Sequence, residues 1–341
     1  MKKAKSLLKI GAVYMGTVLG AGFASGQELL QFFVRFSYRG LLGCTLAGVL
    51  FCLLGAIILS KSYGLSEKTY RKYLKTVFKG PLSSFLAFVG EVFLCVSFCI
   101  MLSGSGAFFA QRLFLPPLWG ILLTDAICLC VFLYDIKGLS VLNLILTPIM
   151  LLGTVYVAFH SIFTGSQTVF LPQVNPHGLF LPYAVFYVGY NMLTAAAVLV
   201  PAAALAEDRK TAVRGGVFGG LMLTVLAVLC STALFVSDAS WDSPLPMLLL
   251  SKQAGTVAYF TYSAVLFMAM LTTAVSTGFS VVQRLCSLGM GQKGAAVSVC
   301  LAAIPLSFFE FSALVRYCYL FFGVLGILLV GGILWEWFKR I

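Results

Sequence analysis

The first apolar stretch of the chain, from about residue 7 to residue 36, is long enough to cross a bilayer but has an unusual centre. Residues 16–28 read GTVLGAGFASGQE, with four glycines, hydroxyl and amide side chains, and Glu28. A glycine in a helix interior costs about 1 kcal/mol relative to alanine, and a mid-membrane carboxylate costs at least about 2.5 kcal/mol. Irregular backbone persists at this depth only where protein or a polar cavity surrounds it. The stretch therefore predicts a broken helix whose free amides and carbonyls form a binding site.

An alternative is that the glycines at 16, 20, 22 and 26 are close-packing motifs on one intact helix. Packing alone does not explain why Ser25, Gln27 and Glu28 lie beside them. A nucleotide site is excluded, because the glycine spacing misses the dinucleotide fingerprint and no strand precedes it.

Composition indicates the class of protein. Hydrophobic residues make up 60% of the 341 residues and charged residues 10%, which is far from a soluble domain and predicts a polytopic helical membrane protein. The net charge of +12 does not indicate nucleic-acid binding, because the basic residues follow a membrane topology. With ten spans, 18 of the 23 Lys and Arg residues fall on the inner side, and the outer side keeps only Arg35, Arg39, Arg112, Lys252 and Arg316. This bias predicts an even number of spans with both termini cytoplasmic.

The expected fold class is an all-α polytopic membrane protein with about ten transmembrane helices in two inverted five-helix repeats, helices one and six being interrupted. It forms a single transmembrane domain, with repeat one at about 7–163 and repeat two at about 179–338, separated by an external loop. The spans are expected at about 7–36, 40–61, 81–113, 118–134, 138–163, 179–205, 215–236, 256–290, 294–309 and 314–338.

Span six repeats the theme of span one. Tyr187, Gly189, Tyr190, Asn191 and Thr194 interrupt its apolar sequence near mid-membrane, and prolines lie nearer its ends. Interrupted helices in corresponding positions of two halves are the best sequence indication of a transporter built from inverted repeats. A packing aromatic and an interhelical hydrogen bond are the alternative roles for Tyr190 and Asn191.

Other polar groups lie inside apolar spans. Thr272 and Thr273 precede Ser276 and Thr277 by one helical turn, so they form a polar stripe that must face protein or water. Glu91 and Asp125 are either functional or part of a structural network with Tyr or Arg. A short helix folded over the outer mouth is expected near residues 247–250.

Enzyme and metal sites are not expected. The ten cysteines lie almost entirely in apolar spans without a C-x-x-C pair, and only two histidines are present. No hydrolase or metalloprotease motif occurs. The chain is therefore predicted to be neither an enzyme nor a transition-metal protein.

The sequence from Gly11 to Glu28, GAVYMGTVLGAGFASGQE, resembles the opening signature of the YkvI family of bacterial membrane proteins, and the resemblance extends over essentially the whole chain. More distantly, the chain is similar to the amino acid, polyamine and organocation superfamily. The leucine-transporter-type fold of that superfamily has ten core helices in two inverted repeats. The resemblance implies unwound first and sixth helices around a central substrate site.

The expected function is a secondary active transporter of a small polar solute, an amino acid or related amine, working by alternating access in the lipid bilayer. Backbone amides at the positive end of a half-helix would meet an anionic group, and side chains of spans three and six would line the rest. The predicted substrate ligands are Gly20, Gly22, Ser25, Ser103, Tyr187, Tyr190 and Asn191. The alternative is a membrane receptor on the same fold that binds a ligand without net transport.

Sodium is the expected coupling ion, and no other cofactor is expected. The unwound part of span one offers the Gly16 and Leu19 carbonyls to a small hard cation. The resemblance to sodium-coupled relatives implies that the Ala269 carbonyl and the Thr272 and Thr273 hydroxyls complete the site. Some proton-coupled relatives place a lysine from span five there, and span five here has none. The competing possibility is that protonation of Glu28 or Glu91 drives the cycle.

Overall fold

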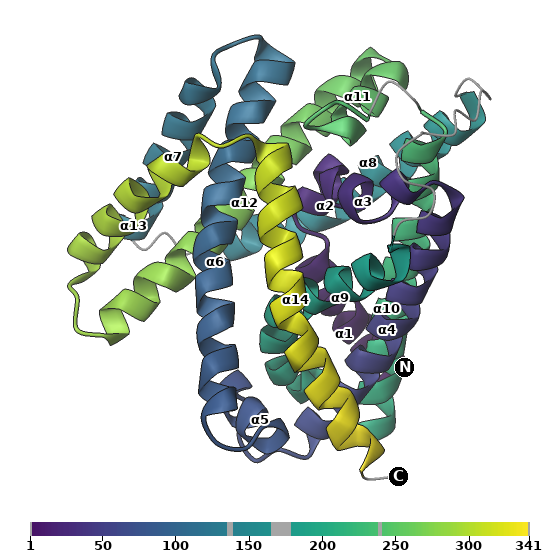
Figure 1. Cartoon of the computed structure of the whole chain (residues 1–341), viewed down its shortest axis with the longest axis vertical. Coiled ribbons are helices and arrows are strands. Elements are labelled where there is room, and N and C mark those ends of the chain that lie inside the picture. The colour runs from purple at the N-terminus through teal and green to yellow at the C-terminus, as the bar shows by residue number, and fades with distance from the viewer. Residues whose placement is uncertain (1, 135–138, 165–178, 238–240, 340–341) are drawn as a thin grey trace.

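A computed structural model describes residues 2–134, 139–164, 179–237 and 241–339, with the side chains of 139–147 excluded. An external loop is expected at 164–178, and its residues 165–178 lie outside the described residues, whereas Thr164 is the last residue of α8. Every regular element within the described ranges is helical (Figure 1). In order they are α1 (Lys2–Val18), α2 (Ala21–Ser25), α3 (Gln27–Phe32), η1 (Val34–Phe36), α4 (Tyr38–Tyr63), α5 (Tyr70–Val77), α6 (Pro81–Phe108), η2 (Phe109–Leu113), α7 (Pro117–Tyr134), α8 (Leu139–Thr164), α9 (Phe180–Ala202), η3 (Ala203–Leu205), α10 (Arg209–Phe235), α11 (Pro246–Gln253), α12 (Thr256–Ser287), α13 (Gln292–Ser307) and α14 (Phe311–Phe338).

Seven segments of the described chain are long and apolar enough to cross a membrane: those built on α4, α6, α7, α9, α10, α12 and α14. Two shorter apolar helical segments, Pro148–Thr164 of α8 and Gln292–Ser307, accompany them. The expectation of a polytopic all-helical membrane protein is confirmed at this level. The exact count of ten spans in inverted repeats stays a prediction.

The helices form two groups with α14 between them. In one group α10 packs against α4 and α1, and α4 packs against α9. In the other, α6, α7, α12 and α13 contact one another, with α8 against α12. Figure 1 shows α7 and α13 beside α6 on the left, and α14 crossing the front of the molecule. The α14 helix contacts both α9 and α6.

Small residues allow the closest helix contacts. A Cβ added to Gly216 or Gly220 of α10 would overlap the backbone of α4 at Gly55 or Cys52. Lipid supplies no hydrophobic driving force between helices, so such close backbone approach is a main source of packing energy in membranes. From α1, the buried Tyr14 hydroxyl donates a 2.9 Å hydrogen bond to the Phe51 carbonyl and fixes α1 against α4.

The first interruption is confirmed and the second is wrong. The backbone leaves the helix between α1 and α2, whereas α9 runs without a break through Tyr187, Gly189 and Asn191. Two contacts explain the difference. Gly189 is the close-packing site for Gly323 and Gly326 of α14, and the Asn191 side chain donates to the Tyr187 carbonyl at 2.9 Å. The glycine serves helix packing, and the amide is satisfied within its own helix.

Both chain termini lie in the lower half of the molecule in Figure 1, the half that also holds α5. Lys3 of α1 pairs with Asp208 before α10 at 2.7 Å, and Lys61 of α4 pairs with Glu336 of α14 at 3.3 Å. We call this the α5 end and the opposite one the α11 end. The short helix predicted near residues 247–250 is present as α11, and its position at the outer mouth stays a prediction.

Candidate functional site at the break in the first helix

The break has a defined backbone path. The amide of Gly20, which a continuous helix would direct to the Gly16 carbonyl, donates instead to the Val18 carbonyl at 2.9 Å. Gly20 is extended (φ −83°, ψ −179°) and precedes α2 without a side-chain cap. The first amides of α2 therefore lack partners within that helix, as the binding-site prediction requires. A Cβ added to Gly20 meets no atom within 4 Å, so the break borders open space here.

A second kink follows five residues later. Gly26 adopts φ +83°, a left-handed conformation that glycine tolerates best, and separates α2 from α3. A Cβ there would overlap Met247 and approach Pro246 of α11. The α11 helix therefore packs directly on the kink.

Glu28 is the buried acid of this region, with 5% of its surface exposed. Its carboxylate accepts a 2.6 Å hydrogen bond from the Tyr190 hydroxyl of α9. Gly22 leaves room for this arrangement, because a Cβ at that position would overlap Glu28 Oε1. Glu28 also lies in the first turn of α3, where the helix dipole favours negative charge. The break thus couples α2, α3 and α9 through one carboxyl group.

Aromatic rings surround that hydrogen bond. The Tyr190 ring centroid lies 4.6 Å from Tyr319, 5.5 Å from Phe32, 5.5 Å from Tyr187 and 5.9 Å from Phe93. The Tyr187 hydroxyl is buried without a hydrogen-bond partner among the described residues. These rings exclude water and lower the local dielectric constant, which strengthens the hydrogen bond between Tyr190 and Glu28.

Two residues that sequence reasoning missed tie the break to the second helix group. The Tyr262 hydroxyl of α12 donates to the Ala24 carbonyl at 2.6 Å, and it lies 3.3 Å from the Thr154 hydroxyl of α8. Their only sequence signal is a hydroxyl in an apolar helix, which by itself usually has no functional meaning.

The predicted sodium ligands lie in two places. Ala269 and Thr272 share one face of α12, where the Thr272 hydroxyl donates to the Ala269 carbonyl at 3.2 Å. The carbonyls of Gly16 and Leu19 lie at the end of α1, and α12 packs against α2 just beyond them. Thr273 is only partly buried, and its carbonyl accepts from Ser276 and Thr277.

Ser103 belongs to a different environment. Its hydroxyl donates to the Phe309 carbonyl at 2.7 Å, in the turn between α13 and α14. It lines a cavity of about 890 Å³ bounded by α6, η2, α7, the segment before α11 and this turn. Gln111 also lines the cavity, and its side-chain oxygen accepts hydrogen bonds from Ser243 (3.0 Å) and from the amide of Leu245 (3.2 Å), which anchors the start of α11.

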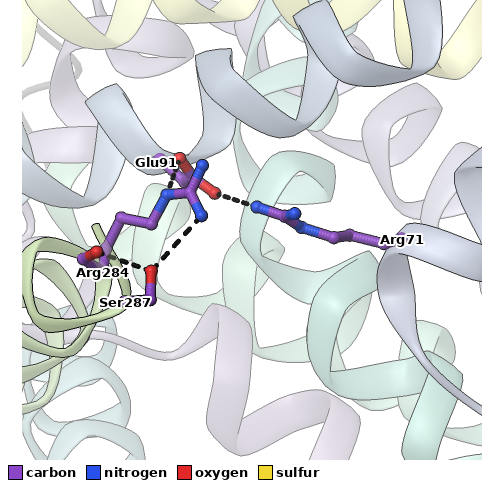
Figure 2. A network of polar contacts seen from close by, with 4 residues as sticks. All are labelled: Arg71, Glu91, Arg284 and Ser287. Carbon is purple, nitrogen blue, oxygen red and sulfur yellow. Dashed lines mark hydrogen bonds and ion pairs between the residues drawn. The ribbon is translucent and has the colours of Figure 1, made fainter. Parts of the chain in front are cut away.

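Glu91 forms an ion-pair network at the α5 end (Figure 2). Its carboxylate accepts from Arg71 of α5 at 3.0 Å and from Arg284 of α12 at 2.8 Å. Arg284 also lies 3.5 Å from the Ser287 hydroxyl. Of the two roles open to Glu91, the contacts therefore match a polar network that joins α5, α6 and α12.

Within the part of the chain that the structure describes, no three His, Cys, Asp or Glu side chains lie close enough to hold a metal ion. Asp125 is buried on α7, and its Oδ1 atom has no hydrogen-bond partner in the described ranges. The absence of a transition-metal site stays a prediction.

Comparison with solved structures identifies the class of fold. The chain is similar to inward-facing Mhp1 (TM-score 0.63, 15% identity, 98% of this chain and 76% of that one). It is also similar to a manganese transporter of Eremococcus coleocola, with a TM-score of 0.64 and 12% identity over 93% of this chain and 76% of that one. A third similar structure is MhsT in complex with L-phenylalanine, with a TM-score of 0.62 and 16% identity over 94% of this chain and 80% of that one. The chain thus shares the fold of secondary transporters, and these neighbours are transporters rather than enzymes.

Comparison with known sequences confirms the family resemblance. The chain is 27% identical to the membrane protein YkvI of Bacillus subtilis (strain 168), over 98% of this chain and 97% of that protein. It is 26% identical to YyaD of the same organism, over 93% of this chain and 92% of that protein. No protein-family model matches the chain.

Proposed function

We propose that the protein is a secondary active transporter that carries a small polar solute, an amino acid or related amine, across the bacterial cell membrane by alternating access. The broken first segment and the nine helices α4, α6, α7, α8, α9, α10, α12, α13 and α14 form ten spans in this proposal. They are organised as inverted repeats of about 7–163 and 179–338, with both termini cytoplasmic. The observation that carries the proposal is the break at Gly20, which offers unpaired amides beside a buried carboxyl group.

The substrate lies at this break. An anionic group of the solute meets the amides at the start of α2, at the positive end of the half-helix. In this proposal Tyr187, Tyr190 and Asn191 line the opposite wall from α9, and Ser25 completes the site. Ser103, the remaining predicted ligand, lines the separate cavity beside α7 and lies outside this site. The L-phenylalanine bound to MhsT supports an amino acid as the solute class.

The test of this site is substrate uptake into proteoliposomes. A library of small solutes is screened by thermal stabilisation of the purified protein, and radiolabelled hits are then assayed for uptake by wild type and by Gly22→Leu. We expect Gly22→Leu to abolish uptake, because its side chain overlaps the Glu28 carboxylate. Equal uptake by the two proteins would remove the substrate site from the break.

Sodium is proposed as the coupling ion, held by the Gly16, Leu19 and Ala269 carbonyls and by the Thr272 and Thr273 hydroxyls. Support comes from the redirected Gly20 amide, which leaves the Gly16 carbonyl without its usual donor. It also comes from the adjacent Thr272 hydroxyl and Ala269 carbonyl on α12. These are hard oxygen ligands, as a small hard cation requires.

A pair of variants separates sodium coupling from proton coupling. Replacing both Thr272 and Thr273 with alanine should abolish sodium-stimulated uptake and leave its pH dependence intact. Glu28→Gln should leave sodium stimulation in place. If wild-type uptake is indifferent to sodium and collapses in Glu28→Gln, the proton on Glu28 drives the cycle and the sodium assignment is wrong.

A further inference from the structure

The α5 helix is the amphipathic element at the α5 end. Tyr73, Leu74 and Phe78 are buried, and the Phe78 ring occupies the space that a Cβ on Gly332 of α14 would need. The opposite side of the segment carries Lys75 and Lys79, both exposed. One side of this segment is therefore packed on the protein, and the other presents positive charge.

Two lysines of this segment have no acidic partner among the described residues. Arg71 pairs with Glu91, and Lys72 lies 3.4 Å from Glu67. Lys75 and Lys79 make no ion pair with any residue in the described ranges, although both flank a well-packed helix end. Their charge is available to an anion from outside the protein.

An exposed apolar stripe begins directly after Lys79. Leu82, Phe85 and Phe88 recur at three-residue intervals on α6, so they share one helix face, and they are 38%, 45% and 60% exposed. In a membrane protein such a face contacts acyl chains. Cationic side chains that lead into a lipid-facing apolar stripe match the two halves of an anionic phospholipid.

We propose that α5 and the first turns of α6 form a binding site for an anionic phospholipid. Lys75 and Lys79 bind its phosphate-containing headgroup, and Leu82 and Phe85 contact its acyl chains. The site has a structural consequence because α5 bridges the helix groups. Arg71 binds Glu91 of α6, while Lys61 of α4 donates to the Thr76 carbonyl at 3.0 Å and pairs with Glu336 of α14. A lipid that holds α5 in place therefore stabilises this junction.

The experiment measures thermal unfolding of the full-length protein in a nonionic detergent, titrated with phosphatidylglycerol or phosphatidylcholine. We expect phosphatidylglycerol to stabilise the wild type and phosphatidylcholine to have little effect. Replacing Lys75 and Lys79 with glutamine should weaken the apparent affinity for phosphatidylglycerol about 30-fold, from about 5-fold for each lysine near a charged surface. The matched control replaces Lys210 and Lys293, two exposed lysines outside α5, and should retain wild-type affinity.

Two further arms test each half of the site. Replacing Leu82 and Phe85 with serine should also weaken the response to phosphatidylglycerol, and both side chains are exposed enough for the fold to tolerate the change. Inorganic phosphate at matched concentration should not stabilise the protein. Equal stabilisation by phosphate or phosphatidylcholine would overturn the proposal, and so would an unchanged response in the Lys75 and Lys79 variant.

Discussion

Substitution of Gly22 by alanine should be costly, whereas the same substitution at Gly20 should be nearly neutral. A Cβ at Gly22 would overlap Glu28 Oε1, and no atom lies within 4 Å of a Cβ at Gly20. The smallest side chain at Gly22 must therefore displace the carboxyl group from its 2.6 Å hydrogen bond with Tyr190. Overpacking typically costs about 1–3 kcal/mol, and a lost hydrogen bond to a carboxylate about 1.5–3 kcal/mol. Because one displacement causes both, we expect a total of about 2–4 kcal/mol.

The assay is thermal unfolding of the purified protein in one detergent, with both variants and wild type in parallel. At roughly 2–4 °C per kcal/mol, Gly22→Ala should lower the midpoint by about 4–16 °C. Gly20→Ala should change it by no more than about 2 °C, because alanine adopts the extended conformation found there without strain. Equal midpoints for the two variants would refute the claim that Gly22 exists to accommodate Glu28.

Three further predictions follow from individual contacts. Tyr190→Phe removes the donor to Glu28 and should destabilise the protein by about 1–3 kcal/mol in chemical or thermal unfolding. The matched control is Tyr183→Phe, which removes a hydroxyl that makes no hydrogen bond within the described residues and should be neutral within about 0.5 kcal/mol. Glu91→Gln weakens two partly exposed ion pairs and should lower the free energy of unfolding by about 1 kcal/mol or less. This difference in stability from wild type should shrink in high salt. A difference that does not change with salt would contradict an electrostatic origin. Asp208 caps α10 by accepting a hydrogen bond from the Thr211 amide. Its pKa lies below the usual aspartate range, mainly because of its hydrogen bond with Lys3. The stabilising effect of Asp208 is therefore complete at pH values above its unfolded-state pKa and is lost as pH falls through its folded-state pKa. We expect Asp208→Asn to destabilise the protein at pH 7 and to resemble wild type near the acid limit. Unfolding midpoints measured across a pH series check this expectation.

The break in the first helix was predictable because its signal is local. Glycines, hydroxyls and a carboxylate in one apolar stretch cost free energy that only an irregular, shielded backbone offsets, and the structure bends at Gly20 and Gly26. The sixth span carries similar residues with a different outcome. Whether Gly189 breaks a helix or packs one depends on Gly323 and Gly326, more than 130 residues away, which a local pattern does not contain.

Contacts between side chains that are distant in the sequence could not be predicted from local patterns either. The sequence marked Glu28 and Glu91 as unusual, but only the fold assigns Tyr190 to one and Arg71 with Arg284 to the other. For Ser103, the local sequence suggested a role in substrate binding that its contacts in the fold do not support. It lies among small polar residues that resemble a substrate wall, yet its hydroxyl is bonded to the Phe309 carbonyl in the turn between α13 and α14.

Counterflow in proteoliposomes tests the central claim most directly. Vesicles are loaded with an unlabelled solute that stabilises the protein, and entry of the labelled solute is followed after dilution. The transporter account predicts transient accumulation of label with wild type and none with Gly22→Leu. Solute-dependent stabilisation without any counterflow would contradict it, since a receptor on the same fold binds its ligand without moving it.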